Sequence, residues 1–237
     1  MALFTDIRTA VDAVTGLIRR RIVPVTLELI DQESLTAVSA HVGREMAPPG
    51  TGAMLLVEVD GARAAVAEEI DQVAQACREA GAIRVVPAPD EEARNRLWTT
   101  RRSISMALKA TGLLKINHDV VVPRGRVPDL FSLLETIREE HRLKIVAFGH
   151  AGDGNIHVNF MVDRNDPDER KRAAAAERVL FERVVALEGS ISGEHGIGFA
   201  KAPYVGIELS PEEIALMKRV KAAFDPNGIL NPGKIFP

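Results

Sequence analysis

The sequence contains a single cysteine, Cys77, among 237 residues. One thiol cannot form an internal disulfide or build a cysteine-based metal cage, so we expect a reducing compartment, the cytoplasm. Charge of one sign is not in excess either, since 30 Lys and Arg face 33 Asp and Glu, a net charge of −3. This balance argues against partners that are recognised through charge, namely nucleic acids and anionic membranes.

Long apolar runs are also missing from the sequence. No stretch approaches the roughly 18–20 residues that a membrane-spanning helix requires, and the N-terminus lacks a secretory signal pattern. What is present is ordinary globular usage, with 46% hydrophobic and 27% charged residues, which excludes disorder, collagen and coiled coils. We therefore expect a soluble protein with a buried core in one large or two small domains.

Helical spacing of apolar residues alternates with short strand-like runs along the chain. Helices are predicted over residues 6–21, 34–46, 62–80, 91–108, 127–141, 169–188 and 211–223. Strands are predicted over residues 24–30, 54–59, 83–86, 120–122, 144–148 and 156–162, with an irregular tail over 225–237. Helix–strand units of similar length suggest pseudo-repeated split βαβ halves. The sequence therefore predicts an α+β fold, a ferredoxin-like antiparallel sheet covered by helices.

The segment FGHAGDGNIHVNF, residues 148–160, joins two apolar strands through a Gly/Asp/Asn turn, which predicts a β-hairpin. His157 and Asn159 share one face of the outgoing strand, and the turn can fold His150 back beside His157. Two imidazoles that converge on one point form half of a metal site. The alternative is that the histidines satisfy local backbone groups and the glycines only shape the turn.

A second segment, SISGEHGIG at residues 190–198, places Glu194 and His195 between glycines. Glycine lets the backbone approach a ligand closely, so the segment offers a carboxylate ligand and a base. A solvated loop with two polar residues is the alternative. With His150 and His157, Glu194 would form a His₂-carboxylate set that leaves coordination positions open for a substrate. Zn²⁺, Mn²⁺ and Fe²⁺ all accept such ligands.

The helix predicted over residues 91–108 carries a third candidate group. Arg101 and Ser105 lie four residues apart and share a helical face. An arginine fork beside a hydroxyl suits a substrate carboxylate, whereas a surface charge is the simpler alternative. Trp98 on the same helix is expected in the core. Rival motifs are missing, because the glycine spacings fit neither a dinucleotide fingerprint nor a phosphate-binding loop, and no nucleophile elbow occurs.

Three blocks in this order, FGHAGDGNIHVNF, SGEHGIGFAKAPYV and DPNGILNPGKIFP, resemble the C-terminal domain of FAD-linked 2-hydroxyacid dehydrogenases. That family includes glycolate oxidase flavin subunits, D-lactate dehydrogenases and D-2-hydroxyglutarate dehydrogenases. The segments PVTLELID (24–31) and INHDVVVP (116–123) extend the resemblance over nearly the whole chain. It implies that residues 1–237 form a cap and substrate domain. The FAD-binding domain, of the vanillyl-alcohol-oxidase type, would be absent from this chain and would be supplied in cis or as a separate subunit.

The resemblance also implies roles for single residues. His150, His157 and Glu194 would bind a divalent metal that chelates the hydroxyl and carboxylate of a small 2-hydroxyacid. His195 would take the hydroxyl proton while a hydride passes to FAD. The remaining implied roles are substrate contacts by Arg101, Ser105 and Asn159, and flavin contacts by Asn231 and Lys234.

The sequence departs from the family pattern before the Asp119 strand. Asn117 or His118 stands where the family has a lysine, and Lys115 lies too far from Asp119. This departure favours glycolate or D-lactate over a dicarboxylate substrate.

Because residues 2–4 look like the end of a strand, we expect one domain of a larger protein, inactive alone, with homodimerisation left open. Two alternatives remain, a metal-binding or subunit-interaction module without redox activity and a His₂Glu metallohydrolase.

Overall fold

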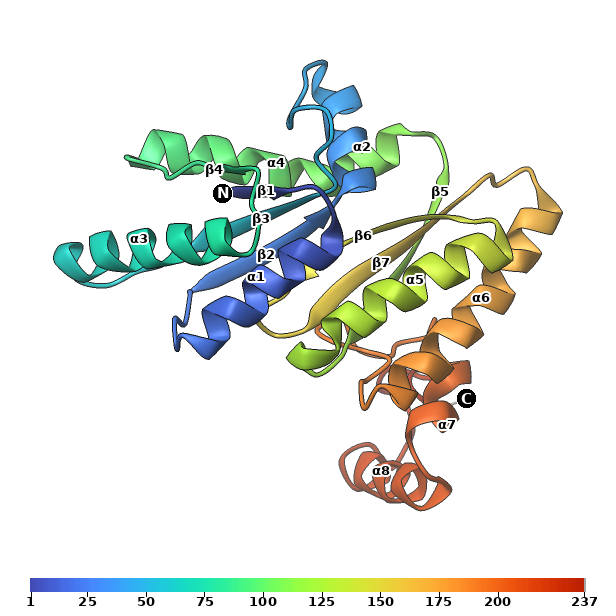
Figure 1. Ribbon diagram of the computed structural model, residues 1–237. Coiled ribbons are helices and arrows are strands. Elements are labelled where there is room, and N and C mark those ends of the chain that lie inside the picture. The colour runs from blue at the N-terminus through green and yellow to red at the C-terminus, as the bar shows by residue number, and fades with distance from the viewer. Residues whose placement is uncertain (237) are drawn as a thin grey trace.

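The computed structural model describes residues 1–236 as a seven-stranded antiparallel sheet with helices on both faces (Figure 1). The strands are β1 (Ala2–Phe4), β2 (Thr26–Asp31), β3 (Ala53–Glu58), β4 (Arg84–Val85), β5 (Leu114–Val121), β6 (Lys144–His150) and β7 (Asn155–Val162). The helices are α1 (Ile7–Arg19), α2 (Gln32–Val42), α3 (Arg63–Glu79), α4 (Glu91–Ala110), α5 (Val127–His141), α6 (Pro167–Ala186), α7 (Val205–Glu208) and α8 (Pro211–Phe224). Two 3₁₀ turns, η1 (Arg124–Arg126) and η2 (Ala202–Tyr204), complete the elements. The predicted α+β class is confirmed.

The sheet consists of two halves with related strand orders. In the first half, β1–α1–β2–β3–α3–β4 gives the spatial order β4-β1-β3-β2, with α2 inserted between β2 and β3. In the second half, β5–α5–β6–β7–α6 gives the order β6-β7-β5, and the halves join where β2 pairs with β6. The first order is that of a ferredoxin-like unit. The predicted ferredoxin-like sheet is therefore confirmed.

The second half has no full fourth strand at the edge of β5. The chain returns there after α6, but only an isolated bridge between Val121 and Ser190 forms. The backbone N–H of Ser190 donates to Val121 O at 2.9 Å, and Val121 N–H donates back at 3.1 Å. Because the chain then leaves the sheet, residues 191–204 are free to cross one of its faces.

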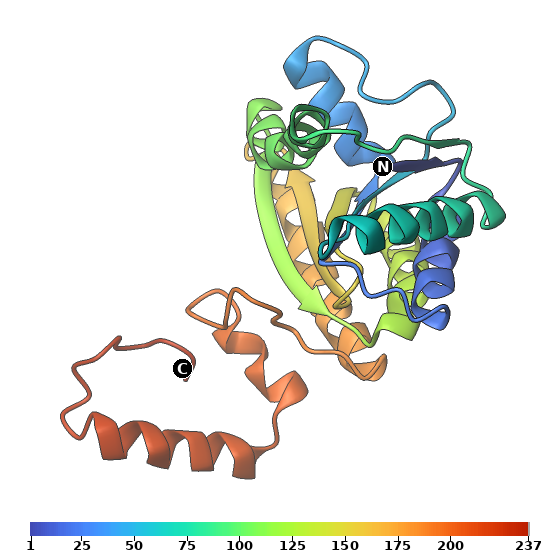
Figure 2. The same ribbon diagram turned by 90° about the vertical axis from the view of Figure 1, so that its left-hand side faces the viewer.

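The two faces of the sheet are covered unequally. Helices α1, α3, α5 and α6 pack on one face and bury the larger core cluster, whereas α2 and α4 cover part of the other face (Figures 1 and 2). The smaller cluster under α2 and α4 extends only as far as Phe148 and Met161. Beyond these residues, the second face carries the polar side chains described below.

Some elements differ from their predicted bounds. α2 ends at Val42 instead of residue 46, because Gly43 adopts a left-handed conformation with φ 68° that terminates a helix. β5 begins well before the predicted strand at residues 120–122. The prediction is too short because polar residues on one face of this strand interrupt its apolar pattern. Trp98, expected in the core, is only partly buried and donates from Nε1 to Glu58 at 3.0 Å.

The C-terminal segment lies apart from the sheet. Helix α8 and the tail after it project away from the strands (Figure 2), and no residue of α8 is buried. Several of its large apolar side chains are exposed, namely Leu216, Met217, Val220 and Phe224, as are Ile229 and Leu230 in the tail. Across the described residues 1–236, none of the helices combines the length and apolar character that a membrane crossing requires.

Candidate functional site

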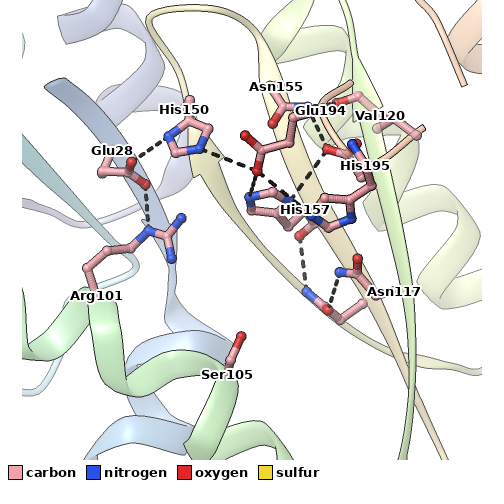
Figure 3. Close-up of polar contacts among 12 residues, drawn as sticks. Glu28, Arg101, Ser105, Asn117, Val120, His150, Asn155, His157, Glu194 and His195 are labelled. Atoms are coloured by element: carbon pink, nitrogen blue, oxygen red, sulfur yellow. Dashed lines mark hydrogen bonds and ion pairs between the residues drawn. The ribbon is translucent and has the colours of Figure 1, made fainter. Parts of the chain in front are cut away.

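Polar side chains from four strands converge on the partly covered face of the sheet (Figure 3). The β6–β7 hairpin is confirmed, and its register places Phe148 opposite His157 and His150 opposite Asn155. His150 and His157 therefore lie on one face, with ring centroids 5.6 Å apart. The residues that share this face are Glu28 on β2, Asn117 and Asp119 on β5, His150 on β6, and His157 and Asn159 on β7.

The loop after Ser190 brings Glu194 over the two histidines. Oε1 of Glu194 lies 3.6 Å from Nε2 of His157 and 3.9 Å from Nε2 of His150. Nε2 of His195 lies 3.8 Å from the same oxygen. The structure thus brings the three predicted metal ligands and the predicted base around one atom, Glu194 Oε1. Imidazole nitrogens and a carboxylate oxygen are the donor set that divalent Zn, Mn and Fe accept, so these residues fit a metal.

Asp119 is one of two site residues that sequence reasoning missed, and Glu28 is the other. Its carboxylate is fully buried, and Oδ1 lies 3.6 Å from Nδ1 of His157. Single ligand atoms of Asp119, His157, Glu194 and His195 all lie within 4.8 Å of one another. The sequence did offer one signal, the carboxylate of Asp119 within the apolar strand INHDVVVP. A charged residue is rarely buried unless it is paired, so a carboxylate in an apolar strand indicates a partner.

The hydrogen bonds of Asp119 connect it to two residues around the site, Asn155 and His195. Oδ1 accepts from Nδ2 of Asn155 at 2.7 Å, and Oδ2 accepts from the backbone N–H of His195 at 2.8 Å. Burial works to raise the pKa of Asp119, but these two donors lower it overall. Both oxygens are thus engaged, so Asp119 holds the His195 backbone while Oδ1 stays 3.6 Å from Nδ1 of His157.

His157 is held in the neutral form. Burial, reinforced by the positive charge of Arg101, lowers the pKa of His157 to about 4. Its Nδ1 is buried without a hydrogen-bond partner and faces Asp119. With the proton on Nδ1, the lone pair of Nε2 points toward Glu194, which is the tautomer that a metal ligand needs.

His150 and Arg101 share a second buried carboxylate, Glu28. Nδ1 of His150 donates to Glu28 Oε1 at 2.5 Å, and Nε of Arg101 donates to Glu28 Oε2 at 2.6 Å. The hydrogen bond to Glu28 raises the pKa of His150. Burial works to raise the pKa of Glu28, but the hydrogen bond from His150 and the charge of Arg101 lower it overall. No sequence motif pointed to Glu28.

The predicted substrate residues occupy different positions. Arg101 lies on α4 at the border of the site, and its guanidinium carbon stands 4.7 Å from the ring centroid of Phe148. Ser105, one turn further along α4, accepts from Nζ of Lys115 at 3.4 Å. Asn159 is fully buried and donates to the backbone oxygens of Val146 and His157, both at 3.1 Å. Its direct contact with a substrate stays a prediction.

Asn117, one of the two residues that could stand at the place of the family lysine, is anchored by Asn159. Its Nδ2 donates to Asn159 Oδ1 at 2.8 Å. Lys115 lies on the same face of β5, further from Asp119, and burial lowers its pKa. The structure therefore places an amide, and beyond it an ammonium group, along this side of the site.

The C-terminal tail is attached to the loop that carries the predicted base. The backbone N–H of Ile235 donates to Gly198 O at 2.9 Å, and Nζ of Lys234 lies 4.6 Å from the ring centroid of Phe199. Lys234 and Asn231, the predicted flavin contacts, thus belong to a segment that runs along the Glu194–His195 loop. Their role toward a flavin stays a prediction.

A buried lysine anchors the same loop to β5. Nζ of Lys201 donates to the backbone oxygen of Asp119 at 2.7 Å, and the backbone N–H of Gly193 approaches that oxygen at 3.3 Å. Gly193 leaves no room for a side chain, because a Cβ there would stand 1.8 Å from Nδ2 of Asn155 and 2.9 Å from Oδ1 of Asp119. The position of Glu194 therefore depends on close passage of this glycine over Asp119.

Replacing Gly193 with alanine should weaken the site. The added Cβ must displace either the loop or the Asp119–Asn155 pair, and such overpacking costs about 1–3 kcal/mol. We expect metal affinity to fall at least about tenfold, a change of ~1.4 kcal/mol, measured by titration of the chain with Zn²⁺. Gly206→Ala is the control, because a Cβ at Gly206 meets nothing within 4 Å. Equal affinities in the two variants would contradict this account of the loop.

The comparisons with known proteins show the family and the fold of the chain. The family described as FAD linked oxidases, C-terminal domain, matches residues 1–235. The chain is 37% identical over 236 residues to glycolate oxidase subunit GlcD of Bacillus subtilis, covering 100% of this chain and 50% of that protein. It is 31% identical to a D-lactate dehydrogenase of Anaerostipes hadrus, covering 98% of this chain and 50% of that enzyme.

A solved structure shows the same fold. Substrate-bound p-cresol methylhydroxylase superposes with a TM-score of 0.71 at 16% identity, over 99% of this chain and 51% of that one. The fold and the match together define a domain of flavin-dependent oxidoreductases. The chain belongs to the family of C-terminal domains of FAD-linked oxidases. It spans about half the length of the curated relatives that it matches.

Proposed function

We propose that this chain is the substrate and cap domain of an FAD-dependent 2-hydroxyacid dehydrogenase of the glycolate or D-lactate class. The single observation that carries the proposal is the arrangement of His150, His157 and His195 around Glu194 Oε1, with Arg101 at the border of the same site. Such a site can hold both ends of a small hydroxyacid. The names of the relatives, a glycolate oxidase subunit and a D-lactate dehydrogenase, point to the same substrate class.

We assign the metal to His150, His157 and Glu194 for a physical reason. Each histidine has a carboxylate near its Nδ1, Glu28 for His150 and Asp119 for His157, which orients Nε2 toward Glu194. Asp119 is not assigned as a ligand, because both of its oxygens accept hydrogen bonds. When bound, the metal would lower the pKa of the substrate hydroxyl, and the flavin would accept the hydride.

The residues of this chain then do the binding and the proton transfer. Arg101 presents its guanidinium to the substrate carboxylate. His195 is half-exposed beside Glu194, so its Nε2 can receive the hydroxyl proton and release it to solvent. Removal of that proton and of one hydride converts the 2-hydroxyacid into a 2-oxoacid, which balances the reaction.

The remaining proposal concerns the half of the relatives' length that this chain does not span. A flavin-binding domain, in cis or as a separate subunit, would pack against the exposed apolar side chains of α8 and the tail. Asn231 and Lys234 would then contact the flavin from the tail. The apolar exposure supports this docking because six large apolar side chains of α8 and the tail are exposed, Phe224 by 82%, and grouped exposed apolar side chains are characteristic of an interface.

The test uses the chain joined to a flavin-binding half. We expect about one divalent metal per chain by elemental analysis, and oxidation of glycolate or D-lactate coupled to reduction of an artificial electron acceptor. Chelation should remove the metal and the turnover together, and added Zn²⁺, Mn²⁺ or Fe²⁺ should restore both. Full turnover after metal removal, or hydrolytic activity of the chain alone, would contradict the proposal.

A further inference from the structure

We propose that Glu28 is a positioning residue that aims two groups of the site at once, the imidazole of His150 and the guanidinium of Arg101. The inference rests on the proposed function and deepens it, because it connects metal binding to recognition of the substrate carboxylate. Glu28 belongs to the first half of the sheet, whereas the proposed metal ligands all belong to the second half.

The sheet register places Glu28 directly beside His150. The two residues are partners where β2 pairs with β6, at the junction of the two halves. Glu28 is buried, with 2% of its surface exposed, and its side chain uses one oxygen for each neighbour. The His150 ring is therefore held through Nδ1 by a group that itself cannot move freely. A histidine oriented in this way presents Nε2 in one direction, toward Glu194 (Figure 3).

Arg101 is held by the other oxygen of Glu28. It donates from Nε, and no hydrogen bond from its terminal nitrogens occurs within residues 1–236. The Phe148 ring lies against the guanidinium and restricts its plane. The terminal nitrogens, which form the fork that binds a carboxylate in two hydrogen bonds, face the space between His150 and Ser105 (Figure 3).

A purely structural ion pair does not account for this arrangement. Glu58 on β3 provides such a structural link, because it joins the sheet to α4 through Arg94 at 3.2 Å and Trp98 at 3.0 Å. Among the described residues 1–236, the hydrogen bond and ion pair of Glu58 go to Trp98 and Arg94, which we do not assign to the site. Glu28 makes the same strand-to-helix link, but both of its partners are groups that we assign to the chemistry. One carboxylate thus orients the metal ligand and the substrate arginine together.

The test compares Glu28→Gln with Glu58→Gln. Glutamine keeps the size of the side chain, but it replaces one of the two oxygens that accept from His150 and Arg101 with an NH₂ group, which cannot accept. We expect Zn²⁺ affinity of the chain, measured by competition with a chromogenic chelator, to fall about 10–100-fold in Glu28→Gln. In the complete enzyme, the KM for the hydroxyacid should rise as well. Glu58→Gln should change neither quantity more than about twofold.

Two further variants separate the effect on metal binding from the effect on substrate binding. Arg101→Met should raise the KM and leave Zn²⁺ affinity unchanged. Glu28→Asp, with its shorter side chain, should partly lower the Zn²⁺ affinity and partly raise the KM. Unchanged Zn²⁺ affinity and KM in Glu28→Gln would overturn this inference alone, provided that wild-type chain binds Zn²⁺. Equal losses in Glu58→Gln would also overturn it, since they would indicate a structural role. A wild-type chain that binds none of Zn²⁺, Mn²⁺ and Fe²⁺ would overturn the proposed metal site together with this inference.

Discussion

Replacing Glu194 with alanine should remove the metal from the chain and lower turnover of the complete enzyme by about a thousandfold or more. Glu194 Oε1 is the point on which the three imidazoles converge. Loss of several kcal/mol of charge stabilisation, about 4 kcal/mol for a thousandfold, is what removal of a catalytic metal costs. Elemental analysis of the purified variant and its steady-state rate are the two measurements.

The fold should survive this change. Glu194 is 56% exposed in its side chain, so its loss leaves no cavity in the core, and the thermal unfolding midpoint should stay near that of the wild-type chain. His150→Ala should also lose the metal. Wild-type metal content in both Glu194→Ala and His150→Ala would show that other residues hold the metal.

Replacing His195 with alanine should retain the metal but lower kcat by about 10²–10⁴-fold, the usual contribution of a general base. The ring of His195 is stacked on that of His157, with centroids 5.4 Å apart, and half of its side chain is exposed. That position suits a group that exchanges protons with solvent. The KM should change little, because His195 is not assigned to carboxylate binding.

This variant also decides between the two donor sets that the structure brings together. His195 Nε2 is as close to Glu194 as His150 Nε2 is, 3.8 Å against 3.9 Å, and His195 belongs to the cluster with Asp119 and His157. Loss of metal in His195→Ala, with metal retained in His150→Ala, would make His195 a ligand. Near-normal turnover in His195→Ala would instead defeat its assignment as the base.

Local sequence patterns predicted those parts of the site that depend on neighbours in the chain. The hairpin of residues 148–160 follows from two apolar runs around a Gly/Asp/Asn turn, and its period of two places His157 and Asn159 on one face. Strand β5 shows where such reasoning fails. Its polar face lines the site, so Asp119 and Asn117 interrupt the apolar pattern, and most of the strand was missed.

The partners of the site residues lie far apart in the chain. Glu28 meets His150 across 122 positions, and Asp119 meets the backbone of His195 across 76. No local pattern encodes either contact, because each depends on which strands pair and in what register. The same applies to the Ser190 bridge, which replaces a full fourth strand and releases the Glu194 loop over the sheet.

By itself, then, the amino-acid order of this protein determined most of the elements, the α+β class, and the two glycine-rich segments that hold histidines and a carboxylate. Helix formation, strand formation and turn formation depend on residues a few positions apart, so they can be predicted from a single sequence. Only the tertiary structure decided that Glu28 lies next to Nδ1 of His150 and Asp119 next to Nδ1 of His157. Glu28 is placed by the pairing of β2 with β6 and Asp119 by the pairing of β5 with β7, and both pairings depend on the fold of the whole chain.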